Sequence, residues 1–391
     1  MGEAVIVSYA RTPVTDAYRG SLANTSIVEL GKVAVAEALK RSGVAAEDVD
    51  DVILGEVLEG GGDLARYIAL DLGLPPDTPG LAVQRQCGSG LAAVNAAAAS
   101  IRAGMDKVVI AGGLESMTQA PVTFFKSPSP WGGLVQGLPD SHPETPDAPA
   151  RNMMITVGEN TADACGVTRE QMDEWSYHSH MRAVAAIDNG TFAQEIVPVE
   201  VRGRKGDVVK VADTDEHPRR DTSLEKLAAL PSLPQSKGRI TAGNSSSLND
   251  AAAAMVVVDA DYAQAHGLTP LAAVRSWAAA GVPPRDTGLA PITAIPRAVD
   301  RAGLKLDDMQ LVEINEAFAS MAVACSRELG FPHDMVNVNG GAVGIGHPVA
   351  ASGARILGHL VLELRRRGAR YGVASLCAGG GMGVATVVEA L

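Results

Sequence analysis

The chain has 391 residues, 46% of them hydrophobic but only 4% aromatic, and its 45 acidic and 33 basic residues give a formal net charge of −12 at pH 7. A chain of this length can form two or three domains, and its acidic balance argues against a general nucleic-acid-binding protein. Four cysteines are too few for a disulfide scaffold and lack zinc-site spacing. The first residues lack the basic and the long apolar regions of a secretory leader, so we expect none, and the longest apolar run, near Ala251 to Val258, is too short to cross a membrane. We therefore expect a cytoplasmic protein with no metal site and no membrane or nucleic-acid partner.

The first part of the chain predicts alternating helices and strands. A helix ends at Gly43 and is followed by a short turn and a strand around Val52. An Ala-rich helix over Leu91 to Ile101 then leads into a strand over Lys107 to Ala111 and a Gly-rich turn. Helices and strands in alternation are typical of an α/β domain.

A segment of different character follows. Residues 127–151 are rich in Pro, Gly and Ser and predict an irregular loop. The pattern over Thr168 to Ala186 predicts a helix with Thr168 as its N-cap. Arg202 to Lys210 combines basic residues with two glycines and predicts a turn or hairpin. We interpret roughly 120–249 as an inserted, lid-like domain.

The last part of the chain is a diverged copy of the first. The pattern Ala-x-x-Arg-x-Gly that ends at Gly43 recurs at Gly303, and the same offset of 260 residues relates Cys87 to His347. A helix over Ala354 to Arg367 and a strand over Tyr371 to Leu376 continue the copy. We infer a duplication that gives two α/β halves, 1–119 with 250–269 and 270–391. Pseudo-twofold packing would bring Cys87 and His347 to one site.

Three short segments could supply acyl-transfer chemistry. Cys87 precedes Gly88-Ser89-Gly90 at the start of a helix, where the partial positive charge favours a thiolate. His347 lies between Gly346 and Pro348, where it can act as a base or donate to an oxyanion. Cys377 ends an apolar strand and precedes three glycines, whose N–H groups could form an oxyanion hole with that of Cys87. A lone cysteine is more often structural, which is our interpretation of Cys165 and Cys325.

With a fourth segment, these residues resemble those of the thiolases, the acetyl-CoA C-acyltransferases. The matching stretches include Gln86-Cys87-Gly88-Ser89-Gly90, Gly112-Gly113-Leu114-Glu115-Ser116-Met117, Asp215-Glu216-His217-Pro218-Arg219, Thr241-Ala242-Gly243-Asn244-Ser245-Ser246, Asn315-Glu316-Ala317-Phe318, Gly346-His347-Pro348, Ser352-Gly353-Ala354-Arg355 and Cys377-Ala378-Gly379-Gly380-Gly381. The resemblance covers essentially the whole chain. It implies a duplicated five-layer α/β/α/β/α core, with residues 120–249 as a loop domain that binds coenzyme A.

The resemblance also assigns roles. It implies that Cys87 becomes acylated, that His347 activates it, and that Cys377 moves the proton on the α-carbon. Asn315 would hold a water that shares one oxyanion hole with His347, and the N–H groups of Cys87 and Gly379 would form the second. Coenzyme A, a co-substrate and not a permanent cofactor, would contact the loop-domain side of the site. The expected contacts are Arg219, Ala242, Ser246, Phe318 and Met153. The resemblance further implies acyl-CoA substrates and a homodimer or homotetramer.

Departures from the family pattern concern the substrate. Where short-chain biosynthetic thiolases carry His-Met-Gly, this chain has Met153-Met154-Ile155, and Ser247 stands where glycine is usual. Because the short-chain histidine is absent, we expect thiolytic cleavage of 3-ketoacyl-CoA, with acetoacetyl-CoA synthesis as the alternative. Two other functions stay open: a ketosynthase-type condensing enzyme, which pairs its cysteine with two histidines, and a non-catalytic acyl-CoA-binding homologue.

Overall fold

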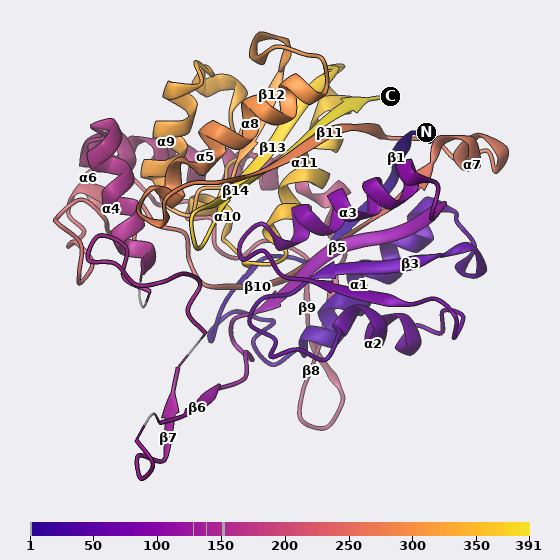
Figure 1. The fold of residues 1–391 in the computed structure, drawn as a ribbon, viewed down its shortest axis with the longest axis horizontal. Coiled ribbons are helices and arrows are strands. Elements are labelled where there is room, and N and C mark those ends of the chain that lie inside the picture. The colour runs from indigo at the N-terminus through magenta and orange to yellow at the C-terminus, as the bar shows by residue number, and fades with distance from the viewer. Residues whose placement is uncertain (1, 128, 138, 151–152) are drawn as a thin grey trace.

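Two half-sheets joined edge to edge organise the chain (Figure 1). The computed structural model describes residues 2–127, 129–137, 139–150 and 153–391. The strands of the first half, in order across the sheet, are β1 (Ala4–Arg11), β10 (Asn249–Asp259), β5 (Val108–Ser116), β3 (Asp51–Gly55) and β4 (Gly80–Val83), with the short β2 (Thr15–Asp16) beside β10. Those of the second half are β11 (Ala272–Gly281), β14 (Met382–Ala390), β13 (Tyr371–Ala378) and β12 (Leu311–Ile314). The halves meet where β1 pairs with β11 through Val5↔Ala273 and Ile6↔Ala272.

Two helices lie between the half-sheets and form the middle layer. These are α3 (Ser89–Ala103) and α11 (Ser352–Arg367), which share one buried cluster with the inner faces of both half-sheets. The outer face of the first half is covered by α1 (Ile27–Ser42) and α2 (Leu64–Asp71), and that of the second by α8 (Ala290–Arg301) and α9 (Ala319–Glu328). The predicted five layers and the duplicated core are therefore confirmed.

The duplication is visible element by element. A short 3₁₀ turn at Ala46–Asp48 follows α1, and its counterpart at Leu306–Asp308 follows α8, at the offset of 260 residues found in the sequence. The strand order β1-β10-β5-β3 of the first half matches β11-β14-β13-β12 of the second. The N-termini of α3 and α11 consequently occupy equivalent positions.

Small residues allow the two central helices to touch at their first turns. A Cβ added at Gly90 would lie 2.5 Å from the carbonyl oxygen of Ala350, and one at Gly353 would lie 2.3 Å from the backbone nitrogen of Leu91. Real side chains do not fit in such gaps, so glycine is required for this close approach. The turns that precede α3 and α11 are thereby held against each other.

The inserted segment carries the remaining helices and two hairpins. Its elements are β6 (Phe124–Lys126), β7 (Leu134–Gln136), α4 (Met153–Cys165), α5 (Arg169–Asp188), β8 (Val199–Arg202), β9 (Val208–Ala212) and α6 (Leu224–Ala228). The helix α5 begins after Thr168, whose capping box with Gln171 matches the predicted N-cap. Outside this segment, the first half adds the short helix α7 (Ala260–Ala265) after β10, and the second half adds α10 (Ala342–Ile345).

One expectation for this segment is partly corrected. The described residues of 127–151 are mostly irregular, as expected, but β7 lies among them and pairs with β6 in a hairpin that projects from the body of the molecule (Figure 1); residues 128, 138 and 151 lie outside the described residues. Ser-, Pro- and Gly-rich sequence joins the two strands. Within the described ranges, no helix combines the length and hydrophobicity needed to cross a bilayer.

Candidate active site

Cys87 lies in a tightly held turn directly before α3. Its side chain is 8% exposed, and the preceding residue, Gln86, has a left-handed backbone with φ 49°. The hydroxyl of Ser89 accepts from the N–H of Arg85 at 2.8 Å and donates to the carbonyl of Gln86 at 2.6 Å. A residue other than glycine keeps a left-handed backbone only where the surrounding structure holds it there. Here that residue is Gln86, and its conformation positions the thiol of Cys87.

Burial dominates the acidity of the thiol. It raises the pKa of Cys87 to about 11, and the nearby carboxyl of Glu115 acts in the same direction. The backbone N–H groups of Gly379 and of Cys87 itself oppose this shift in part. Desolvation is the largest cause of this shift, so burial opposes the thiolate that the helix N-terminus favours. The contribution of Gly379 also shows that its N–H is directed at the sulfur of Cys87.

The hydrogen bonds of His347 assign its tautomer. Its Nδ1 lies 2.6 Å from the hydroxyl of Ser352, and that hydroxyl also donates to the carbonyl of Pro348 at 2.8 Å. A hydroxyl has one hydrogen, so Ser352 must accept from Nδ1–H and the lone pair of the ring lies on Nε2. The Nδ2 of Asn315 lies 3.4 Å from Nε2, as a donor to that lone pair would.

His347 is held neutral. Burial lowers its pKa to about 3, and the buried guanidinium of Arg355 contributes to the shift. A neutral imidazole with its lone pair on Nε2 can take a proton, and once protonated it can donate to an oxyanion. The Oδ1 of Asn315 is buried and has no hydrogen-bond partner among the described residues, so it is free to accept from a bound molecule.

Cys377 lies at the end of β13, close to Cys87. Its side chain is 1% exposed, and its Sγ contacts the sulfur of Met321 at 3.4 Å. Burial raises the pKa of Cys377 well above its ordinary value, and the charge of Cys87 raises it further. The turn that follows requires glycine, because Gly381 has φ 81° and a Cβ there would lie 2.2 Å from the carbonyl oxygen of Val282.

The predicted catalytic residues thus form two linked groups. Cys87, Cys377 and Gly379 are joined by the N–H of Gly379 and by the mutual influence of the two thiols, and His347 is joined to Asn315. The groups meet where the first turns of α3 and α11 touch. All five predicted catalytic residues therefore lie around one end of the central helix layer.

Among the expected coenzyme A contacts, Ser246 and Phe318 lie together. The N–H and the hydroxyl of Ser246 both donate to the carbonyl of Ala317, at 3.1 Å each, and Phe318 packs against the backbone of Gly158 in α4. Arg219 and Ala242 are exposed at the surface of the inserted segment. The side chain of Met153 lies outside the described residues.

Three residues for which no role was predicted hold His347 in place. Ser352 fixes the tautomer, Asn249 accepts the N–H of His347 at 2.7 Å, and Glu115 accepts the N–H of Ala350 at 3.0 Å. Ser352 and Glu115 lie within motifs that were recognised, so their positions carried a signal. Asn249 lies three residues beyond such a motif and is brought to His347 only by the fold.

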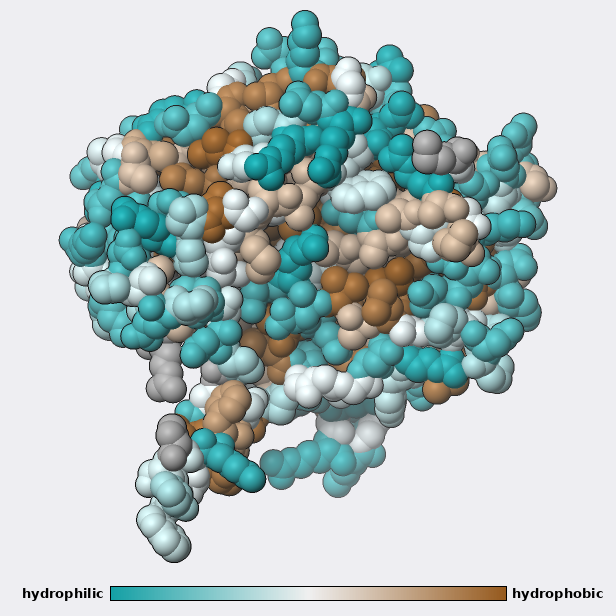
Figure 2. Space-filling view, viewed as in Figure 1, coloured by the Kyte–Doolittle hydropathy of each residue, from teal (hydrophilic) through white to brown (hydrophobic). Residues whose placement is uncertain are grey.

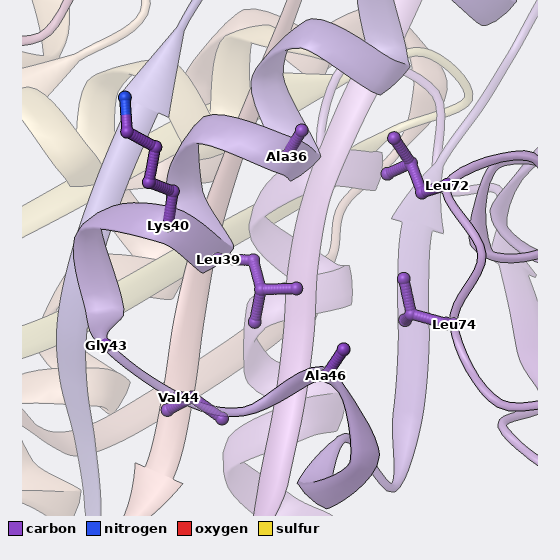
Figure 3. A pocket seen from close by; sticks show the side chains of 8 residues that line it. All are labelled: Ala36, Leu39, Lys40, Gly43, Val44, Ala46, Leu72 and Leu74. Carbon is purple, nitrogen blue, oxygen red and sulfur yellow. The ribbon is translucent and has the colours of Figure 1, made fainter.

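A surface cavity of about 380 Å³ lies elsewhere, between the end of α1 and residues 72–74 (Figure 3). Its lining is aliphatic apart from Lys40. Because it contains no paired acid, base or nucleophile, we do not place the active site there.

Comparison with known proteins gives a consistent family assignment. The family model for the thiolase N-terminal domain matches residues 4–261, and the model for the C-terminal domain matches residues 268–390. An acetyl-CoA acetyltransferase of Syntrophomonas wolfei is 42% identical over 100% of this chain and 99% of its own length, and one of Pseudomonas aeruginosa is 44% identical over 98% of each.

Solved structures agree. A Bacillus anthracis acetyl-CoA acetyltransferase superposes with a TM-score of 0.92 at 40% identity, over 100% of this chain and 99% of that one. Human mitochondrial 3-ketoacyl-CoA thiolase in complex with CoA superposes with a TM-score of 0.91 at 37% identity, over 100% of this chain and 98% of that one.

Proposed function

Because the chain belongs to the thiolase family, we propose that it cleaves 3-ketoacyl-CoA with coenzyme A to give acetyl-CoA and a shortened acyl-CoA, and that it catalyses the reverse Claisen condensation. One observation carries this proposal: a neutral thiol, a neutral imidazole with its lone pair on Nε2 and a second thiol converge at the touching N-termini of α3 and α11. These groups are the nucleophile, the base and the acid that the two half-reactions need.

In the first half-reaction, the sulfur of Cys87 attacks the 3-keto carbon while Nε2 of His347 takes the thiol proton. The N–H groups of Cys87 and Gly379 stabilise the oxyanion that forms. The bond between the α- and β-carbons then breaks and leaves acyl-Cys87 and the enolate of acetyl-CoA. Protonated His347 and a water on Asn315 stabilise that enolate, and Cys377 donates a proton to its carbon.

In the second half-reaction, the thiol of coenzyme A attacks acyl-Cys87 and gives its proton to the Cys377 thiolate. The same N–H pair stabilises the second oxyanion, and the departing sulfur of Cys87 recovers its proton from His347. Both cysteines and the histidine return to their starting protonation states. The scheme requires ping-pong kinetics, because a covalent acyl-enzyme separates the two half-reactions.

Burial suits this mechanism. A thiol of pKa about 11 beside an imidazole of pKa about 3 does not form a stable ion pair, so the proton moves only as the new carbon–sulfur bond forms. The charge that develops lies in a buried site, where fixed N–H donors are most effective.

Coenzyme A would approach along the inserted segment. We propose that Phe318 and Ala242 line the path of the pantetheine chain. Ser246 and Arg219 contact coenzyme A, and Met153 lies near the thioester. The expected division of the chain, 1–119 with 250–269, 120–249 and 270–391, follows from this role of the middle part as a lid.

We also infer a homo-oligomer in the cytoplasm. Two unpartnered features support self-association: the outer edge of β4, where Leu81 is 45% exposed, and the projecting β6–β7 hairpin. Figure 2 shows this hairpin apart from the body of the molecule, and its exposed apolar residues include Phe124 and Trp131. The four cysteines are free thiols, as a reducing compartment favours.

The test is the coenzyme A-dependent loss of 3-ketoacyl-CoA across a chain-length series that begins with acetoacetyl-CoA. We expect turnover that disappears in Cys87→Ala, and the length profile decides between acetoacetyl-CoA and longer substrates. Unchanged turnover in Cys87→Ala would contradict the proposal. Binding of coenzyme A without turnover at any length would favour the non-catalytic alternative.

A further inference from the structure

The loop that carries His347 is supported from the opposite half of the molecule. His347 belongs to the second half of the duplication, but its backbone N–H donates to the side-chain oxygen of Asn249, at the start of β10 in the first half, at 2.7 Å. Three residues further on, the N–H of Ala350 donates to Glu115, at the end of the adjacent strand β5, at 3.0 Å. The catalytic histidine is therefore located by contacts made across the interface between the halves.

We propose that Asn249 is a positioning residue for the reaction, which sets the place of the His347 ring relative to the thiol of Cys87. This inference rests on the proposed function, because it assumes that His347 is the base. Nothing in it requires Asn249 to touch the substrate.

The carboxamide of Asn249 is fixed in one orientation. Its Nδ2 donates to the carbonyl of Thr15 at 3.1 Å, so its Oδ1 must be the atom that faces His347. The hydroxyl of Ser247 donates to the same Oδ1 at 2.8 Å. Asn249 is fully buried, and hydrogen bonds in such surroundings have strict geometry.

The approach of Asn249 depends on a glycine beside the histidine. Gly346 has φ 115°, and a Cβ there would lie 2.6 Å from the carboxamide carbon of Asn249. Any other residue would push this side chain away or strain the backbone. The residue immediately before His347 therefore has no side chain at the point where Asn249 makes contact.

His347 is constrained at three points. Asn249 fixes the backbone nitrogen, Ser352 fixes Nδ1, and Asn315 lies at Nε2. Loss of the first contact allows the whole loop to shift while the ring contacts can still form, so the ring would move relative to Cys87. Displacements of about 1 Å in a catalytic group can reduce the rate about 100-fold.

The experiment compares Asn249→Ala with Asp250→Asn. Asp250 is the next residue and is equally buried, and within the described part of the chain its side chain accepts hydrogen bonds only from Ser116 and Thr118, so it is the matched control for disturbing β10. We expect Asn249→Ala to lower kcat about 10- to 100-fold while the KM for coenzyme A changes less than about threefold. Asp250→Asn should leave kcat within about threefold of the wild type even if the melting temperature falls.

A second readout does not require turnover. Alkylation of Cys87 by iodoacetamide, followed by mass spectrometry, reports the influence of His347 on the thiol, and His347→Asn gives the reference for its loss. Asn249→Ala should move the alkylation rate towards that of His347→Asn. If His347→Asn itself changes nothing, the proposed function fails; if it has an effect that Asn249→Ala does not share, the present inference fails.

Milder variants keep the test decisive if Asn249→Ala does not fold. Asn249→Asp keeps an oxygen for the N–H of His347, and Ser247→Ala removes one donor to Asn249 and leaves His347 bonded. We expect about two- to fivefold losses of kcat in both, with unchanged KM. Full activity in both variants would overturn the proposal.

Discussion

The reactivity of Cys87 towards an alkylating agent should follow its burial. Raising a thiol pKa from 9.0 to about 11 lowers the thiolate fraction near neutral pH about 100-fold. A more basic thiolate is also a better nucleophile, and with a Brønsted coefficient of about 0.45 its intrinsic reactivity rises about eightfold, which offsets part of this loss. The ligand-free protein should therefore react with iodoacetamide at least about tenfold more slowly than a short cysteine peptide.

The assay is the alkylation rate of Cys87 between pH 6 and 10, followed by peptide mass spectrometry, with Cys87→Ala to identify reaction at the half-buried Cys165. The part of the rate that comes from the free thiolate should rise with pH throughout this range, added to a pH-independent part in which neutral His347 takes the proton. A rate above that of the peptide, with a plateau below pH 8, would show a stable thiolate–imidazolium pair. That result would refute the reasoning that burial outweighs the helix N-terminus.

Three further predictions concern other parts of the molecule. Ser352→Ala removes the acceptor of Nδ1–H and leaves a buried N–H without a partner, which costs about 1–3 kcal/mol. It should lower kcat about 10- to 100-fold with a small change in melting temperature. Steady-state kinetics that match the wild type would contradict the assigned tautomer. Arg11 and His359 contact the buried carboxylate of Glu195 and lower its pKa to about 2. The stability that this carboxylate contributes is therefore complete above pH 4.5 and is lost as the pH falls towards 2. The free energy of unfolding of Glu195→Gln should depend less on pH in this range than that of the wild type. Trp131→Ser should lower the oligomer mass in light scattering without loss of helical signal, and an unchanged mass would argue that the hairpin is not an interface.

Much of the architecture could be predicted because the same order of helices and strands occurs twice in the chain. The offset of 260 residues placed Cys87 and His347 at equivalent positions, and the structure shows both in the turns that lead into the helices of the middle layer, which begin at Ser89 and Ser352. Glycines in these segments marked close approaches of the backbone, as at Gly90 and Gly381. Local patterns of this kind are readable because they depend on neighbours in the sequence.

Other features could not be predicted because they depend on distant residues. The pKa of Cys87 is set by the apolar packing around it, whereas the sequence shows only the helix that follows. Asn249 reaches His347 across an interval of 98 residues, and no local pattern indicates that contact. The β6–β7 hairpin was missed because its strands are three residues long and its connection has the composition of an irregular loop.

The most direct test of the account is to mix the protein with acetyl-CoA in the absence of a second substrate and to determine the mass of the intact chain and of its peptides. The account predicts one acetyl group, bound to Cys87 as a thioester and released by added coenzyme A, and none in Cys87→Ala. An acetyl group on another residue, or turnover of 3-ketoacyl-CoA without any acyl-enzyme, would contradict it.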